Sequence, residues 1–164
     1  MATVSVAFQS GKGHTWVLAE AVHKGVGQAA EVSGQIFEFS GKDVHESRFR
    51  NPGLMEALDS SDRIVLGCAT YKGSASSIFK TVLEAAFNPH WLEQRWKDRV
   101  AAGFTNSASQ NGDKTFDPAA AYSVCHVDGH DLGRGERFAG NNWSGGSHSD
   151  LNRVGTWIGA VGSK

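Results

Sequence analysis

The sequence has few cysteines, almost no excess charge and no long apolar run. Its two cysteines, Cys68 and Cys125, lie far apart in the chain, which favours reduced thiols over a disulfide framework. The 16 basic and 17 acidic side chains give a net charge of −1, so neither nucleic acid nor an anionic membrane surface is expected as a partner. No apolar run reaches the roughly 18 residues of a membrane span, and no signal pattern precedes the first predicted strand, so we expect a cytoplasmic protein.

At 164 residues the chain is long enough for one well-buried core, and we expect a single domain over residues 1–164. Apolar runs predict strands at 3–8, 35–39, 63–68 and 100–105, and helical spacing predicts helices at 15–30, 52–59 and 76–87. The first helix is expected to bury Val17, Leu18, Ala21 and Val22. Alternating strands and helices predict an α/β fold with a parallel sheet covered by helices on both faces.

Beyond Lys114 the periodicity is weaker. Residues 118–121 could begin a helix, 122–127 could form a strand, and 151–161 predict a short final helix. The C-terminal part is therefore expected to be irregular or shortened relative to a complete fold of this class.

Polar loops follow three of the predicted strands, at residues 10–15, 70–76 and 105–113. Ligands of open α/β sheets bind at the carboxyl ends of the strands, so these loops are expected to converge on one site.

The first loop, Ser10-Gly11-Lys12-Gly13-His14-Thr15, lies between a strand and a helix. The unpaired N–H groups of a helix's first turn attract anions, which predicts a phosphate site. The spacing fits neither a Walker A loop nor a GxGxxG loop. From this loop alone, an ordinary strand-to-helix turn explains the residues equally well.

Together, the three loops resemble those of flavodoxin-like FMN proteins, most closely the NAD(P)H:quinone oxidoreductase branch typified by the tryptophan-repressor-binding protein (WrbA) family. The second is Ala69-Thr70-Tyr71-Lys72-Gly73-Ser74-Ala75-Ser76, and the third runs from Phe104 to Asp113. The similarity covers residues 3–114. It implies a flavodoxin-like doubly wound sheet of strand order 2-1-3-4-5 and a homodimer or homotetramer.

The resemblance also implies FMN as cofactor, with NADH or NADPH as co-substrate and a small quinone as acceptor, in a ping-pong hydride transfer without a catalytic side chain. It assigns the FMN phosphate to Ser10, Lys12, Gly13, His14 and Thr15. It assigns the ribityl chain and ring edge to Thr70, Tyr71, Lys72, Gly73, Thr105, Asn106 and Ser107, with further contacts from Ser109 and Gly112.

Some residues depart from the family or fit more than one role. Ala69 stands where the family usually has proline, which predicts a less rigid second loop. His126 or His130 could approach the flavin, as a histidine of the family does. A metal site is the alternative use of Cys125, His126, Asp128, His130, Asp131 and His148, although their spacing matches no standard zinc pattern. Trp91, Trp96 and Trp143 are expected in the core or an interface.

Two other functions are compatible with the same loops. One is a flavodoxin-type electron carrier, although the net charge of −1 offers little of the acidic face that carriers use to meet partners. The other is a flavodoxin-like interaction module that has lost its cofactor.

Overall fold

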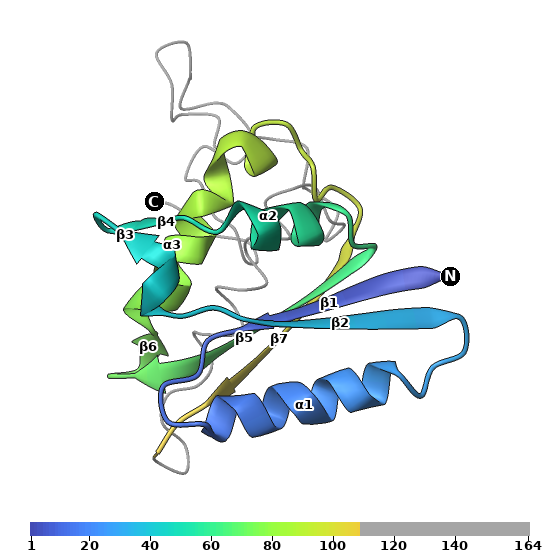
Figure 1. Ribbon diagram of the computed structural model, residues 1–164, viewed down its shortest axis with the longest axis horizontal. Helices are drawn as coiled ribbons and strands as arrows, with labels where there is room; N and C mark the ends of the chain where they lie inside the picture. The colour runs from blue at the N-terminus through green and yellow to red at the C-terminus, as the bar shows by residue number, and fades with distance from the viewer. Residues whose placement is uncertain (109–164) are drawn as a thin grey trace, which may run out of the picture.

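Strands and helices alternate along residues 1–108, the part of the chain that the structure, a computed structural model, describes (Figure 1). In chain order the elements are β1 (Ala2–Phe8), α1 (His14–Val26), β2 (Val32–Glu38), a 3-10 helix (Gly41–Asp43), β3 (Val44–His45), β4 (Arg48–Phe49), α2 (Pro52–Asp59), β5 (Arg63–Tyr71), β6 (Ser74–Ala75), α3 (Ser77–Ala85), a kinked π-helical turn (Phe87–Trp91) and β7 (Val100–Asn106). Among these residues, no helix is both long and apolar enough to cross a membrane.

The four long strands form a parallel sheet. β1 pairs with β2 on one side and with β5 on the other, and β5 pairs with β7. Counted in chain order the long strands are therefore arranged 2-1-3-4, which confirms the predicted order for the residues described. The predicted fifth strand lies outside them. The short β6 pairs antiparallel with the end of β5.

Helices cover both faces of this sheet, as predicted. Figure 1 shows α1 on one face and α2 and α3 on the other. The larger apolar cluster lies on the side of α2 and α3 and includes Phe39, Leu58, Leu66, Phe79 and Trp96, all of them buried. Trp96 therefore belongs to the core, as expected, and the sheet is a central layer with a separate core on each face.

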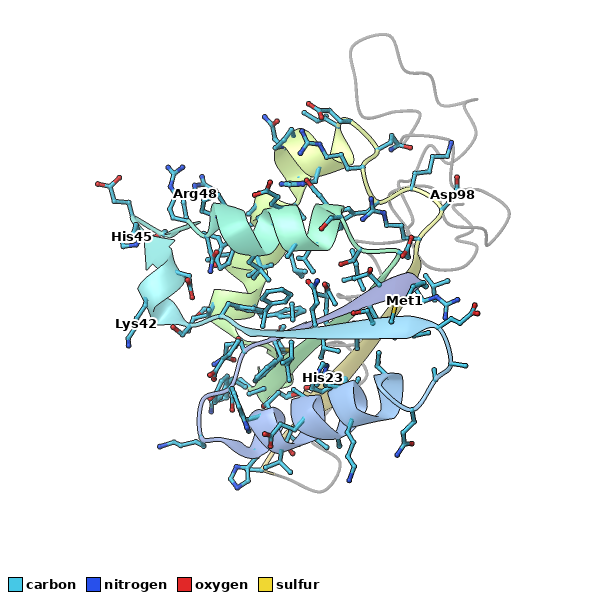
Figure 2. The ribbon with its side chains drawn as sticks, turned by 45° about the vertical axis from the view of Figure 1, so that its right-hand side comes forward. Met1, His23, Lys42, His45, Arg48 and Asp98 are labelled. Atoms are coloured by element: carbon cyan, nitrogen blue, oxygen red, sulfur yellow. The ribbon has the colours of Figure 1, made fainter. Side chains whose placement is uncertain are left out.

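The predicted buried face of α1 is wrong for most of its members. Val17, Leu18 and Ala21 are exposed, whereas Thr15 and Ala19 are buried and Val22 packs against the sheet. Ala19 packs with Val6 and Phe8 of β1 in the apolar cluster on this face. Figure 2 shows His23 on the same inner face, pointing from α1 toward the sheet.

Side-chain caps set the starts of the other two helices. Asn51 Oδ1 accepts a hydrogen bond from the N–H of Leu54 at 3.0 Å, ahead of α2. Ser76 Oγ accepts one from the N–H of Phe79 at 3.2 Å, ahead of α3. These caps satisfy N–H groups that a helix leaves unpaired in its first turn.

Candidate functional site

The carboxyl ends of β1, β5 and β7 lie side by side, and polar residues at or just after these ends are in contact. The N–H of Gln9 donates to the carbonyl of Gly67 at 2.9 Å. A Cβ atom added to Gly11 would collide with the hydroxyl group of Tyr71. Thr70 Oγ1 lies 2.6 Å from Thr105 Oγ1. The three polar segments therefore meet at one edge of the sheet, as their places after parallel strands predict.

The segment after β1 forms a tight turn into α1. Ser10 Oγ accepts a hydrogen bond from the N–H of Gly13 at 3.1 Å. Gly13 precedes the helix with a φ of 87°, in the left-handed region that glycine tolerates best. Within residues 1–108, no side chain caps α1, in contrast to α2 and α3. Its first N–H groups therefore remain as donors for an anion.

Electrostatics at this turn also favour an anion. Lys12 and His14 are exposed, and the first turn of α1 contains no acidic residue. Neither Lys12 nor Lys72 forms an ion pair with any part of the chain that the structure describes. Basic groups beside the positive end of a helix dipole are unfavourable alone and favourable once a negative ligand lies between them. A phosphate group fits this arrangement.

The second segment is a hairpin and not the predicted loop. β5 continues to Tyr71, and Tyr71 pairs with Ser74 of β6 across a two-residue turn. The turn residues Lys72 and Gly73 have φ values of 53° and 74°, as in the type I′ turns that close tight hairpins. Ala69, the expected site of reduced rigidity, lies inside β5 and pairs with Asn106 of β7.

A pair of hydroxyl groups joins the second and third segments. Thr105 Oγ1 donates to the carbonyl of Cys68 at 3.0 Å, and a carbonyl can only accept. The hydrogen between Thr70 and Thr105 must therefore come from Thr70. These two hydrogen bonds join the ends of β5 and β7 and hold the side chain of Thr70 at the edge.

The predicted site residues fall into two groups. The structure places Ser10, Lys12, Gly13, His14, Thr15, Thr70, Tyr71, Lys72, Gly73, Thr105, Asn106 and Ser107 at or next to this edge, although Thr15 is buried beneath the turn. Thr105 and Asn106 belong to β7 itself, not to a loop after it. Ser109, Gly112, His126, His130 and the metal candidates from Cys125 to His148 lie outside the described residues.

Two further observations concern what the site could hold. Among the described residues, no group of three or more histidine, cysteine, aspartate or glutamate side chains is arranged to bind a metal ion.

Gln9, which the sequence patterns did not single out, is buried at the end of β1, and its Oε1 atom has no hydrogen-bond partner within residues 1–108. In the sequence, a role for Gln9 in the site is indicated by its position directly before the turn at 10–15. A buried acceptor without a partner calls for an explanation, and a donor outside the described residues is one.

A parallel sheet of this strand order, with an uncapped helix after β1 and polar residues at the carboxyl ends of β5 and β7, is that of the flavodoxin-like class of α/β proteins. The chain belongs to the family described as NADPH-dependent FMN reductase, whose sequence pattern it matches over residues 6–144. FMN is thus the cofactor that the family supports, and the protein is an FMN-dependent oxidoreductase. The donors and cations at the edge of the sheet fit the phosphate of that cofactor.

Individual relatives agree with this assignment. The chain is 32% identical to Flavodoxin FldP of Pseudomonas aeruginosa (strain UCBPP-PA14), over 98% of this chain and 80% of the relative. A flavodoxin, WrbA-like protein from Agrobacterium tumefaciens is 34% identical, with a TM-score of 0.63 over 79% of this chain and 74% of that one. An archaeal flavodoxin is 17% identical with a TM-score of 0.56, over 79% of this chain and 76% of that one, and shows the shared fold alone.

Proposed function

We propose that this protein is an FMN-dependent NAD(P)H:quinone oxidoreductase that works by a ping-pong cycle, in which the nicotinamide product leaves before the quinone binds. The observation that carries the proposal is the meeting of three polar segments at one edge of the sheet, linked by Tyr71 over Gly11 and by the Thr70 and Thr105 hydroxyl groups. The similarity to WrbA-like proteins supports the choice of a quinone as acceptor.

The proposed roles follow from position. The uncapped N–H groups of α1, with Ser10 and Lys12, bind the FMN phosphate. The hairpin from Thr70 to Gly73 and the end of β7 from Thr105 to Ser107 orient the ribityl chain and the ring. FMN supplies the two-electron chemistry when bound, and the protein supplies binding, orientation and electrostatics. No side chain is required as a nucleophile.

Steady-state turnover tests this proposal. The FMN-loaded protein should oxidise NADH or NADPH in the presence of benzoquinone, and double-reciprocal plots at several quinone concentrations should give parallel lines. Intersecting lines would contradict the ping-pong cycle. An FMN-loaded protein that does not oxidise either nucleotide with any quinone would contradict the enzyme itself.

A matched pair of glycine variants links turnover to the site. Gly11→Ala forces Tyr71 to move, because the added Cβ collides with its hydroxyl group. We expect kcat/KM to fall by about 10-fold, the scale of a small misplacement of binding groups. Gly25→Ala adds the same methyl group to α1 where nothing lies within 4 Å, and kcat/KM should not change. Equal effects of the two substitutions would remove the link between Gly11 and turnover.

A flavodoxin-type electron carrier is the second candidate, because the relative from Pseudomonas aeruginosa is named a flavodoxin. The carrier would bind FMN by the same residues but would not react with NAD(P)H directly. It would accept electrons from a chemical reductant such as dithionite and pass them singly to an acceptor such as ferricyanide. Fast reduction by NAD(P)H favours the enzyme, and reduction by dithionite alone favours the carrier.

A further inference from the structure

The side chain of Gln9 is buried without a partner for its carbonyl oxygen. Gln9 is 4% exposed, and within the described part of the chain its Oε1 atom accepts no hydrogen bond. Its backbone is fixed, because its N–H donates to the carbonyl of Gly67 at 2.9 Å. A buried acceptor that lacks a donor costs free energy in the folded protein. Glutamine at this position therefore needs an explanation outside the packing of the core.

The carboxamide lies close to Gly11 of the first polar segment, which the hydroxyl group of Tyr71 also approaches. Its Nε2 atom is 3.9 Å from the position that a Cβ atom would take on Gly11, and the hydroxyl group of Tyr71 reaches the same position. Side chains alternate along a strand, so Gln9 lies on the same face as Ala7, which belongs to the apolar cluster under α2 and α3. Gln9 is thus a polar group at the boundary between this core and the turn at 10–15.

Only a part of FMN that donates a hydrogen bond can be the partner of Gln9 Oε1. Oε1 only accepts hydrogen bonds. The phosphate of FMN offers only acceptors when it is ionised, and the N–H groups of α1 already suit it. The hydroxyl groups of the ribityl chain can donate, and this chain is bonded directly to the phosphate. The donor closest to a phosphate held at residues 10–15 is therefore a ribityl hydroxyl group.

We propose that Gln9 is a further FMN-binding residue, whose Oε1 atom accepts a hydrogen bond from the ribityl chain. The proposal rests on the proposed function, since it takes the FMN phosphate to lie at the turn that precedes α1. Gln9 then has opposite effects on the apo protein and on the FMN-bound protein. Without FMN the unpaired oxygen destabilises the fold, and with FMN the same oxygen contributes to binding.

The substitution Gln9→Met tests this, because methionine has nearly the same shape and no polar group to leave unpaired. The apo protein should keep or raise its melting temperature. The Kd for FMN should rise by about 3- to 10-fold, the loss of one neutral hydrogen bond. The Kd for riboflavin, which has the ribityl chain but no phosphate, should rise by the same factor. Isothermal titration calorimetry and thermal melts give these values without any assay of activity.

The control is Gln35→Met, the same substitution at an exposed position of the neighbouring strand β2, where neither Kd should change. If Gln9→Met does not fold, Gln9→Asn keeps the carboxamide but shortens its reach, and the same rise in both Kd values is expected. An unchanged Kd for FMN overturns the proposal, and so does a rise for FMN with none for riboflavin, which would place Gln9 at the phosphate. A wild-type protein that binds neither ligand overturns the proposed function together with the role of Gln9.

Discussion

Two glycines near the ends of α1 have opposite consequences for stability. Gly13 has a φ of 87°, whereas Gly25 lies within the helix, and a Cβ at either would meet nothing within 4 Å. Gly13→Ala should lower the free energy of unfolding by about 1 kcal/mol, because the left-handed region strains residues with a Cβ atom. Gly25→Ala should raise it by about 0.5–1 kcal/mol through helix propensity. Urea denaturation measures both, and shifts of the same sign would contradict this account of α1.

Asp59 at the end of α2 holds the segment before β7 in place. Its carboxylate accepts hydrogen bonds from His90 Nδ1 at 2.7 Å, from Arg95 at 2.8 Å and from Trp96 Nε1 at 2.7 Å. Burial alone would raise the pKa of Asp59, but the hydrogen bonds from Arg95, His90 and Trp96 outweigh it, so the pKa lies below its usual range. The folded state thus binds this proton less readily than the unfolded state does.

The pH dependence follows from that sign. The stability that Asp59 contributes is fully present above the unfolded pKa of about 4 and is lost as the pH falls through the lower folded pKa. Asp59→Asn should lower the free energy of unfolding at pH 7 by about 1–3 kcal/mol. Urea denaturation at several pH values should show this difference shrinking below pH ~4.

The control for Asp59 is Glu93→Gln, because Glu93 also contacts Arg95, at 2.7 Å, but has a side chain that is 56% exposed. Its removal should change the free energy of unfolding by less than about 1 kcal/mol, as for most exposed ion pairs. A difference for Asp59→Asn that stays constant down to pH ~3 would contradict a lowered pKa.

At the scale of elements, the pairing of β5 with β7 depends on a glycine. The ring of Phe104 in β7 lies over Gly67 in β5, and a Cβ on Gly67 would collide with three atoms of that ring. Gly67→Ala should therefore cost about 1–3 kcal/mol, the range for an added group in a packed region. Thermal or urea unfolding measures the loss.

A double mutant separates the clash from other effects of alanine at Gly67. Phe104→Leu removes the ring, so Gly67→Ala should cost less in that background than in the wild type. Equal costs in both backgrounds would mean that the ring of Phe104 is not what excludes a side chain from Gly67.

The elements also differ in how far the sequence predicted them. The bounds of α2 were predicted as Pro52–Asp59 and agree with the structure, because Asn51 and Pro52 give local start signals. The hairpin at Lys72 and Gly73 was predicted as a loop, since a lysine in the left-handed region has no clear sequence signal. The exposed Val17 shows a third case, in which packing against the sheet selected a different face of α1 from the one that the apolar residues indicated.

The candidate site shows the same division. The turn before α1 and the polar ends of β5 and β7 could be predicted, because strand order alone brings them to one edge. The proposed role of Gln9 could not be predicted from its position beside the turn alone, since it rests on burial and on an unpaired oxygen, which depend on the packing around it.

At the scale of the whole molecule, the candidate FMN site and the hydrogen bonds to Asp59 lie at opposite ends of the sheet. Figure 2 shows Lys42, which follows β2, at one end and Asp98, which precedes β7, at the other. The site lies at the carboxyl ends of the strands, and the hydrogen bonds to Asp59 lie near their amino ends, since Asp59 precedes β5 and Trp96 precedes β7. The central claim, an FMN site at the carboxyl edge, can therefore be tested apart from the packing at the other end.

The most direct test is the effect of FMN on the melting temperature of the apo protein, because a ligand that binds only the native state must stabilise it. At an FMN concentration of about 100 times the Kd, the stabilisation should be about 2.7 kcal/mol, a rise of roughly 5–10 °C for a protein of this size. Riboflavin, which lacks the phosphate, should raise the melting temperature less at the same concentration. A melting temperature that does not change with FMN at any concentration would contradict the flavin site.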